Sequence, residues 1–260
     1  MVAATVENFG RGAFPVPQAS EPRLLSVGRG APDHYYSQAE LIDAFTEVWN
    51  GDADVKRRMS RLHNAVQVGG RHLALSIPEY LELNTFGQAN DAFIRVGTEV
   101  AERAVSDALE QAGLQAHEVD AIFFTTVTGL ATPTIDARLV NRMGFRPNVK
   151  RTPLFGLGCV GGAAGLARMA DYLRAYPKDC ALLISVELCS LTLQLKDLSI
   201  PNLISSGLFG DGAACVVGVG AQRETERPGP MIVDTQSAFF PDTERVMGWD
   251  IDEKGFNVIL

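Results

Sequence analysis

The sequence lacks three features that would point to other protein classes. It has no uninterrupted run of about 18 apolar residues, which excludes a transmembrane helix. Its N-terminus has no basic stretch followed by an apolar one, so no signal peptide is predicted and we expect a cytoplasmic protein. It also has no excess of positive charge. The formal net charge of −8 argues against broad nucleic-acid binding, so an anionic substrate would need a local basic patch.

Cysteine is scarce as well. None of the four cysteines has the CxxC spacing of metal sites, and no metal is predicted. In a cytoplasmic chain we expect reduced thiols, of which one or two at most are functional. The four are Cys159, Cys180, Cys189 and Cys215.

The rest of the composition is typical of a globular protein, with 46% hydrophobic and 21% charged residues among 260. Helical and strand patterns alternate along the chain, which predicts an α/β fold with a parallel or mixed sheet between helices. The predicted helices are 37–49, 91–112, 133–143 and 160–173, and the clearest strands are 121–128, 181–186 and 212–219. Residues 1–30 are predicted to form a flexible leader, 31–225 a first structural half, and 226–260 the beginning of a second half.

Cys159 is the candidate nucleophile. It stands between a predicted strand and a helix of small residues, in Phe155-Gly156-Leu157-Gly158-Cys159-Val160-Gly161-Gly162. A helix N-terminus stabilises a thiolate, and glycines let a substrate approach the backbone closely. This arrangement suits covalent acyl transfer. The alternative is that Cys159 is a small buried hydrophobic residue, which is how we interpret the other three cysteines.

A second pattern overlaps the first. Gly156, Gly158 and Gly161 match the G-x-G-x-x-G fingerprint of dinucleotide binding, and Glu187 ends the next strand where a ribose-binding acid would lie. An NAD-dependent oxidoreductase is therefore an alternative. Two features weaken it: Pro153 interrupts the preceding strand, and about 150 residues precede a motif that usually opens its domain.

Five ordered motifs between about Tyr36 and the last residue resemble those of bacterial type III polyketide synthases, the chalcone synthase-like branch of the thiolase superfamily. One is the Cys159 loop, and another is Leu208-Phe209-Gly210-Asp211-Gly212-Ala213-Ala214. The others are Thr126-Val127-Thr128-Gly129, Ser185-Val186-Glu187-Leu188-Cys189-Ser190-Leu191-Thr192 and Met247-Gly248-Trp249-Asp250. Ketoacyl synthase III and HMG-CoA synthase share the fold and the cysteine, but their motifs fit less well.

The resemblance implies a thiolase-like layered αβαβα fold, a homodimer, and decarboxylative condensation of malonyl-CoA onto an acyl-CoA starter. Coenzyme A thioesters would be the substrates, with no further cofactor. Cys159 would take the acyl group, Phe209 would fill the gatekeeper position between the CoA tunnel and the cavity, and Arg58 would bind CoA phosphates with Lys56, Arg57 and Arg61 nearby. The cavity-lining positions would be Val127, Cys189, Thr192 and Ser205, with Thr132 reaching the partner subunit's cavity.

Departures from the plant pattern bear on the substrate. Plant enzymes carry a second gatekeeper phenylalanine near Val258, and Cys189 and Ser205 also differ from the chalcone-type pattern. We therefore expect a more open cavity, fatty acyl-CoA starters, and products of the alkylresorcinol or alkylpyrone type.

The family also uses a histidine, in a His-Pro-Gly-Gly context, and an asparagine to activate malonyl-CoA. His34, His63, His72 and His117 all precede Cys159 and lack that context, and Asn257 has no matching surroundings. We therefore expect a complete first half, a truncated second half, and little condensing activity from this chain alone. The contrasting alternative is a non-catalytic truncated thiolase-like protein that binds CoA.

Overall fold

A mixed five-stranded sheet forms the centre of the molecule. The computed structural model describes residues 21–49, 51 and 53–260. The strand order is β1 (Arg23–Gly30), β7 (Asp211–Val219), β6 (Cys180–Leu188), β4 (Ala121–Thr126) and β5 (Lys150–Phe155). Strand β4 is parallel to β5 and β6, whereas β7 is antiparallel to β6 and β1. The mixed sheet predicted from the sequence is thus confirmed.

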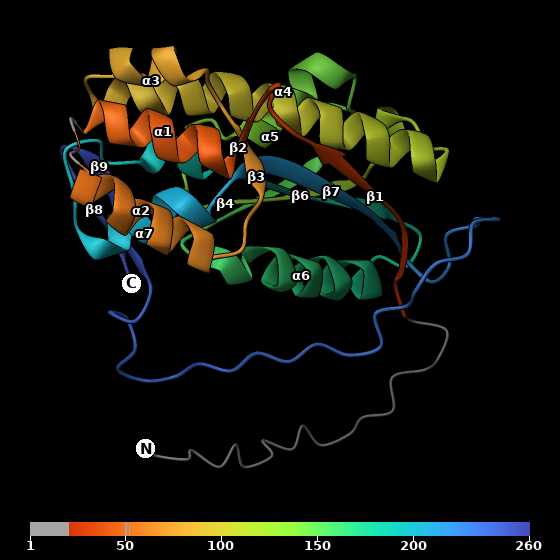
Figure 1. Cartoon of the computed structure of the whole chain (residues 1–260). Helices are drawn as coiled ribbons and strands as arrows, with labels where there is room; N and C mark the ends of the chain where they lie inside the picture. Colours follow the sequence, from red (N-terminus) through yellow and green to blue (C-terminus); the bar gives the residue numbers. More distant parts are fainter. Residues whose placement is uncertain (1–20, 50, 52) are drawn as a thin grey trace.

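Helices cover both faces of this sheet (Figure 1). Helices α4 (Phe86–Ala112) and α5 (Ile135–Met143) lie on one face, and α6 (Gly161–Ala175) lies on the other. The alternation of side chains along β4 serves both layers, because Phe124 packs in the core under α4 while Phe123 packs against α6. The result is a three-layer α/β/α arrangement, in which the larger core lies beneath α4.

Smaller elements gather beyond the carboxyl ends of β4 and β6 (Figure 1). Strand β2 (His34–Ser37) pairs with β3 (Gly70–Leu73), and helices α1 (Gln38–Val48), α2 (Ala53–Ala65), α3 (Ile77–Glu82) and α7 (Ile200–Leu208) complete this end. The hairpin of β8 (Gly248–Asp252) and β9 (Gly255–Ile259) lies against the same end. The short helices are η2 (Ala116–Glu118), η3 (Gly158–Val160) and η4 (Cys189–Thr192).

Local capping explains where two of the helices begin. The predicted capping box of α1 is present, with Ser37 N–H donating to Glu40 Oε2 at 2.8 Å and Glu40 N–H donating to Ser37 Oγ at 3.3 Å. Helix α4 begins five residues earlier than the apolar stripe predicts, because Thr85 accepts a hydrogen bond from the Gln88 backbone at 3.2 Å.

The leader predicted for residues 1–30 is wrong for residues 23–30, which form β1 and pair with β7. Gly28 and Gly30 looked like loop residues in the sequence. In the structure a Cβ atom there would lie 2.2 Å and 2.0 Å from backbone oxygens of α4, so glycine is required by close packing. Residues 1–20 lie outside the described part of the chain. No helix among the described residues is both long and apolar enough to cross a membrane.

Candidate active site

The loop between β5 and α6 presents Cys159. The thiol belongs to η3, immediately before α6, and its side chain is exposed. Gly156 and Gly158 have φ angles of 86° and 57°, in the left-handed region that favours glycine. The chain can therefore turn sharply out of the edge strand and expose Cys159 at the carboxyl end of the sheet.

Helix α6 begins in close contact with the sheet. A Cβ atom on Gly161 would lie 2.5 Å from Thr125 Oγ1, and one on Gly165 would lie 2.4 Å from Leu183 Cδ1. The small residues of this helix thus allow it to approach β4 and β6. This packing fixes the position of the loop that carries Cys159.

The other three cysteines have different surroundings. Cys180 and Cys215 are buried, and burial raises the pKa of the Cys180 thiol to about 12 and that of Cys215 further still. Burial also raises the pKa of Cys189 well above its usual range, with smaller contributions from the charges of Asp211, Glu187 and Cys159.

Glu187 is a buried acid at the end of β6. Its carboxylate accepts hydrogen bonds from the Val127 backbone at 3.1 Å and 3.2 Å and from Thr128 Oγ1 at 2.7 Å. Burial raises its pKa to about 7, although these hydrogen bonds act in the opposite direction. The sequence suggested a ribose-binding role for Glu187 and placed it in one of the family motifs, without indicating that its side chain is buried. In the sequence, a single acidic residue at the end of an otherwise apolar strand is the signal for a buried, hydrogen-bonded carboxyl group.

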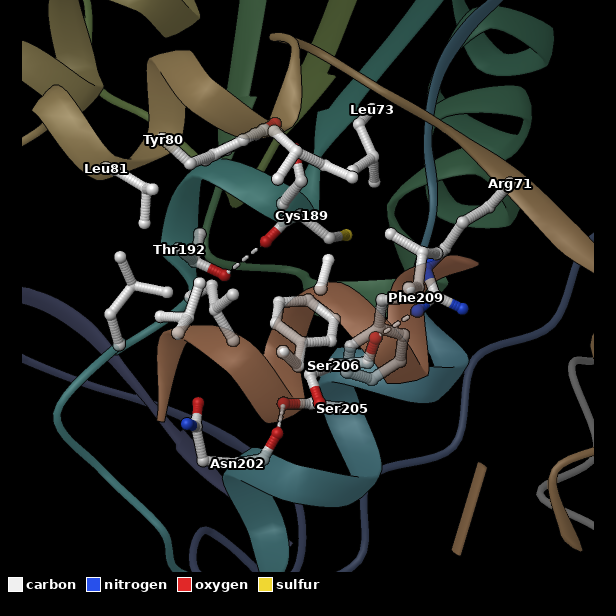
Figure 2. A pocket seen from close by; sticks show the side chains of 18 of the residues that line it. Arg71, Leu73, Tyr80, Leu81, Cys189, Thr192, Asn202, Ser205, Ser206 and Phe209 are labelled. Atoms are coloured by element: carbon white, nitrogen blue, oxygen red, sulfur yellow. Dashed lines mark hydrogen bonds between the residues drawn. The ribbon is translucent and has the colours of Figure 1, made fainter. Parts of the chain in front are cut away.

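A mainly apolar pocket lies beside Cys189 and Phe209 (Figure 2). Four of the predicted cavity or gatekeeper residues line it together: Cys189, Thr192, Ser205 and Phe209. Its far wall comes from α1 and α3, which the sequence analysis did not connect with substrate. The remaining lining residues are Leu41, Ala44, Phe45, Val48, Arg71, Leu73, Ile77, Tyr80, Leu81, Ser190, Leu193, Leu195, Asn202, Ser206 and Trp249.

Neither Cys159 nor the other predicted substrate-binding residues are among those that line this pocket. Val127 is buried at the end of β4, next to Glu187. Thr132 is exposed before α5. Val258 lies opposite Trp249 in the β8–β9 pair, and Trp249 is the one of the two that reaches the pocket wall.

Arg58 is exposed on α2, near the edge of this end of the molecule. Two neighbouring cations are engaged in ion pairs, Lys56 with Asp43 at 2.7 Å and Arg57 with Asp54. Within the described residues no ion pair is recorded for Arg58.

The histidines have other partners. His63 is fully buried and its Nε2 contacts Leu203 O at 3.1 Å, whereas His72 Nδ1 contacts Pro32 O at 2.7 Å. His34 Nε2 lies 4.0 Å from Glu79 Oε2, and His117 belongs to η2.

The NAD-dependent alternative does not fit this topology. The dinucleotide fingerprint normally follows a central strand of a parallel sheet. Here the glycine-rich loop follows β5, which is the edge strand, and the sheet is mixed, because β7 runs antiparallel to the other four strands. The carboxylate of Glu187 is also engaged with its own chain.

Comparison with known proteins identifies the family. The family model for chalcone and stilbene synthases, N-terminal domain, matches residues 15–223. The chain is 48% identical over 238 residues to the 1,3,6,8-tetrahydroxynaphthalene synthase of Streptomyces peucetius subsp. caesius, covering 91% of this chain and 63% of that protein. It is 39% identical to the putative chalcone synthase of Bacillus subtilis (strain 168), covering 91% of this chain and 67% of that protein. The chain thus spans about two thirds or less of these relatives.

Solved structures agree with the sequence matches. The C-terminal type III polyketide synthase domain of Steely1 from Dictyostelium superposes with a TM-score of 0.85 at 26% identity, covering 92% of this chain and 67% of that one. The 1,3,6,8-tetrahydroxynaphthalene synthase of Streptomyces coelicolor A3(2) superposes with a TM-score of 0.83 at 29% identity, and the coverage of the two chains is the same. The thiolase-like layered fold expected from the sequence is confirmed. This chain therefore belongs to the chalcone and stilbene synthase family of type III polyketide synthases and matches its N-terminal domain.

Proposed function

We propose that this chain carries the acyl-loading site of a type III polyketide synthase, with Cys159 as the residue that receives the starter. The Cys159 thiolate attacks the carbonyl carbon of an acyl-CoA, the carbon–sulfur bond to CoA breaks, and the departing CoA thiolate takes up a proton. In the whole reaction, malonyl-CoA then loses carbon dioxide. Its α-carbon attacks the Cys159 thioester, which forms a carbon–carbon bond and frees the thiolate.

The observation that carries this proposal is the contrast between Cys159 and the other cysteines. Cys159 is exposed at a helix start in a glycine-rich loop, whereas burial raises the thiol pKa at each of the other three positions. A nucleophilic cysteine needs access and a thiolate. Only Cys159 combines access with a position at the carboxyl end of the sheet.

The pocket beside Phe209 supports a fatty acyl starter. Its lining is mainly aliphatic and aromatic, and Cys189 and Ser205 are small residues within it. Burying an alkyl tail there contributes roughly 0.8 kcal/mol per methylene, which is several-fold in affinity for each carbon until the pocket is filled. A fatty acyl starter implies alkylpyrone or alkylresorcinol products from the whole enzyme.

The test measures the rate at which Cys159 is acylated by saturated acyl-CoAs of increasing length, using intact-protein mass spectrometry. Loading by the wild-type chain should rise with acyl length and then level off. Cys189→Phe or Ser205→Phe should move the optimum to shorter chains, because an overpacked pocket excludes the tail. Ala175→Phe, exposed at the end of α6, is the control and should leave the profile unchanged. A wild-type profile that peaks at acetyl-CoA would overturn the fatty acyl assignment.

A second outcome is favoured by the relatives, because three of them are named 1,3,6,8-tetrahydroxynaphthalene synthase. The discriminating assay supplies acyl-CoA and malonyl-CoA and identifies the products. 1,3,6,8-Tetrahydroxynaphthalene formed from malonyl-CoA alone would replace the fatty acyl assignment. Loading of Cys159 without any released product would show that the chain accepts a starter without extending it. CoA binding without loading would support the non-catalytic alternative.

A homodimer is part of the same proposal. The edge strand β5 is largely exposed, and Phe155 and Val160 on either side of the Cys159 loop are 52% and 55% exposed. An open sheet edge next to apolar side chains is a natural site for pairing with a second copy.

A further inference from the structure

The carboxyl end of α7 is held by a buried polar cluster that the loading reaction does not use. The cluster consists of Gln38 at the start of α1, His63 on α2 and Arg71 on β3, and we call these three residues the α7 clamp. Their exposed fractions are 7%, 0% and 6%. Three successive elements thus place polar side chains at the end of a helix that lies 136 to 169 residues further along the chain.

The contacts of the clamp converge on Ser206 and Gly207, which lie in the last turn of α7. Arg71 Nη1 donates to Gly207 O at 2.6 Å, and Arg71 Nη2 donates to Ser206 O. Gln38 Nε2 donates to Gly207 O at 3.0 Å, and Gln38 Oε1 accepts from Arg71 Nη1 at 2.7 Å. The last carbonyls of a helix have no partner within it, so these bonds satisfy them.

His63 and two glycines pack closely at this end of α7. The His63 Nε2 atom lies 3.2 Å from Ser206 Oγ, and a Cβ atom on Gly207 would lie 2.5 Å from His63 Cδ2. A Cβ atom on Gly210 would lie 3.1 Å from Arg71 Cβ. The clamp therefore contacts the chain on both sides of Phe209 and leaves it little room to shift.

Placing a buried charged side chain at a helix end has a cost in free energy. Burying a guanidinium removes its hydration, and the cost is recovered only if its hydrogen bonds are well formed. Burial lowers the pKa of Arg71 to about 10, so the side chain stays charged at neutral pH. Burial, and then the charge of Arg71, lower the pKa of His63 to about 4, so His63 is neutral there.

Phe209 is the residue that this arrangement holds. It follows α7 directly, its N–H donates to Ser205 O at 3.0 Å, and its half-buried side chain lines the pocket with Cys189. Figure 2 shows the Arg71 guanidinium beside Ser206 and Phe209. Because the Phe209 ring lines the pocket, a small shift of the backbone at Ser206 and Gly207 would change the position of the ring in the pocket wall.

We propose that Gln38, His63 and Arg71 are positioning residues for Phe209, and that through it they set which acyl chains enter the pocket. The effect on acyl selection rests on the proposed function, in which the pocket beside Phe209 holds the acyl chain. The effect on the ring position does not, so the two are tested separately.

The first experiment observes the ring itself. The chain is labelled with ¹³C in the phenylalanine rings, and the signal that disappears in Phe209→Leu is assigned to Phe209. In Gln38→Met, which keeps the side-chain length but removes three hydrogen bonds, this signal should broaden or split. The control is Thr98→Val, which removes one buried hydrogen bond, to Ile94 O, in α4. An unchanged Phe209 signal in Gln38→Met would overturn the proposal. Arg71→Lys keeps the charge without the two-carbonyl contact and serves if Gln38→Met fails to fold.

The second experiment measures the ratio of Cys159 acylation rates for a long and a short acyl-CoA. Gln38→Met should change this ratio on the order of threefold to tenfold, as expected when about one hydrogen bond's net contribution is lost. In a Phe209→Ala background the same substitution should have no effect on the ratio, because the ring through which it acts is gone. A general loss of stability would lower both rates and leave the ratio unchanged in both backgrounds, which would contradict the selection role. If the wild-type chain is not acylated at all, the proposed function fails while the ring signal still decides the positioning role.

Discussion

Water reaches the four thiols of this chain to very different degrees. Cys159 is exposed, Cys189 is half-buried, and Cys180 and Cys215 are buried. The thiolate is the species that reacts with alkylating reagents, and burial raises the pKa of the last three thiols. Iodoacetamide at neutral pH should therefore label Cys159 on the order of tenfold faster than any other cysteine. Peptide mapping over time measures this, and preferential labelling of Cys189 would show that the nucleophile is misassigned.

The buried carboxyl of Glu187 predicts a pH dependence of stability. Its pKa is about 7 in the folded chain against an ordinary value of 4.5, so the folded state binds the proton more tightly than the unfolded state. The associated stability is fully present below pH 4.5 and is lost as the pH rises through 7. Over this pH range the free energy of unfolding falls by about 3 kcal/mol because of Glu187. Glu187→Gln should remove it.

Urea unfolding of both proteins below pH 4.5 and above pH 7 checks this, because the difference between them isolates one group. Glu110→Gln, exposed on α4, is the control and should retain the wild-type dependence. Equal pH dependence in Glu187→Gln and wild type would show that Glu187 ionises normally.

At the scale of single elements, α2 carries the proposed contact with CoA phosphates. Arg58 should be available for an anion, whereas Arg57 is paired with Asp54. Arg58→Ala should weaken coenzyme A binding several-fold, and Arg57→Ala should change it less. Calorimetric titration with coenzyme A at low and high salt measures both, and salt should weaken wild-type binding more than Arg58→Ala binding. Equal effects of the two substitutions would make α2 an ordinary solvated helix face.

Element boundaries could be predicted from the sequence where local chemistry decides them. The capping box at Ser37 and the buried strand from Ala121 are examples, because side-chain oxygens and apolar runs act over a few residues. Strand β1 could not be recognised, because its glycines are required by α4, which lies some 75 residues further along the chain. Packing between distant segments leaves no local signature.

The same limit applies to the candidate site. Cys159 could be singled out from its glycines, and Cys189, Thr192, Ser205 and Phe209 do line one pocket. The contribution of α1 and α3 to that pocket could not be predicted, since their apolar residues look like ordinary core in the sequence. The α7 clamp was missed for the same reason, because Gln38 and Arg71 meet Gly207 only after folding.

At the scale of the whole molecule, the open edge of the sheet predicts self-association. Phe155→Lys at the end of β5 should lower the fraction of dimer, because it places a charge on the proposed interface. Val27→Lys is the matched control, since Val27 is 58% exposed on β1 at the opposite edge of the sheet. Sedimentation equilibrium over a range of concentrations measures both. A monomeric wild-type chain, or equal dissociation in the two variants, would contradict pairing through β5.

The central claim is that Cys159 receives an acyl group from coenzyme A. The most direct measurement incubates the chain with a fatty acyl-CoA and locates the adduct by intact-mass and peptide analysis. We predict one acyl group per chain, attached to Cys159, absent in Cys159→Ala and retained in Cys189→Ala. An adduct that persists in Cys159→Ala, or no adduct with acyl-CoAs of any length on a chain whose Cys159 still reacts with iodoacetamide, would contradict the account.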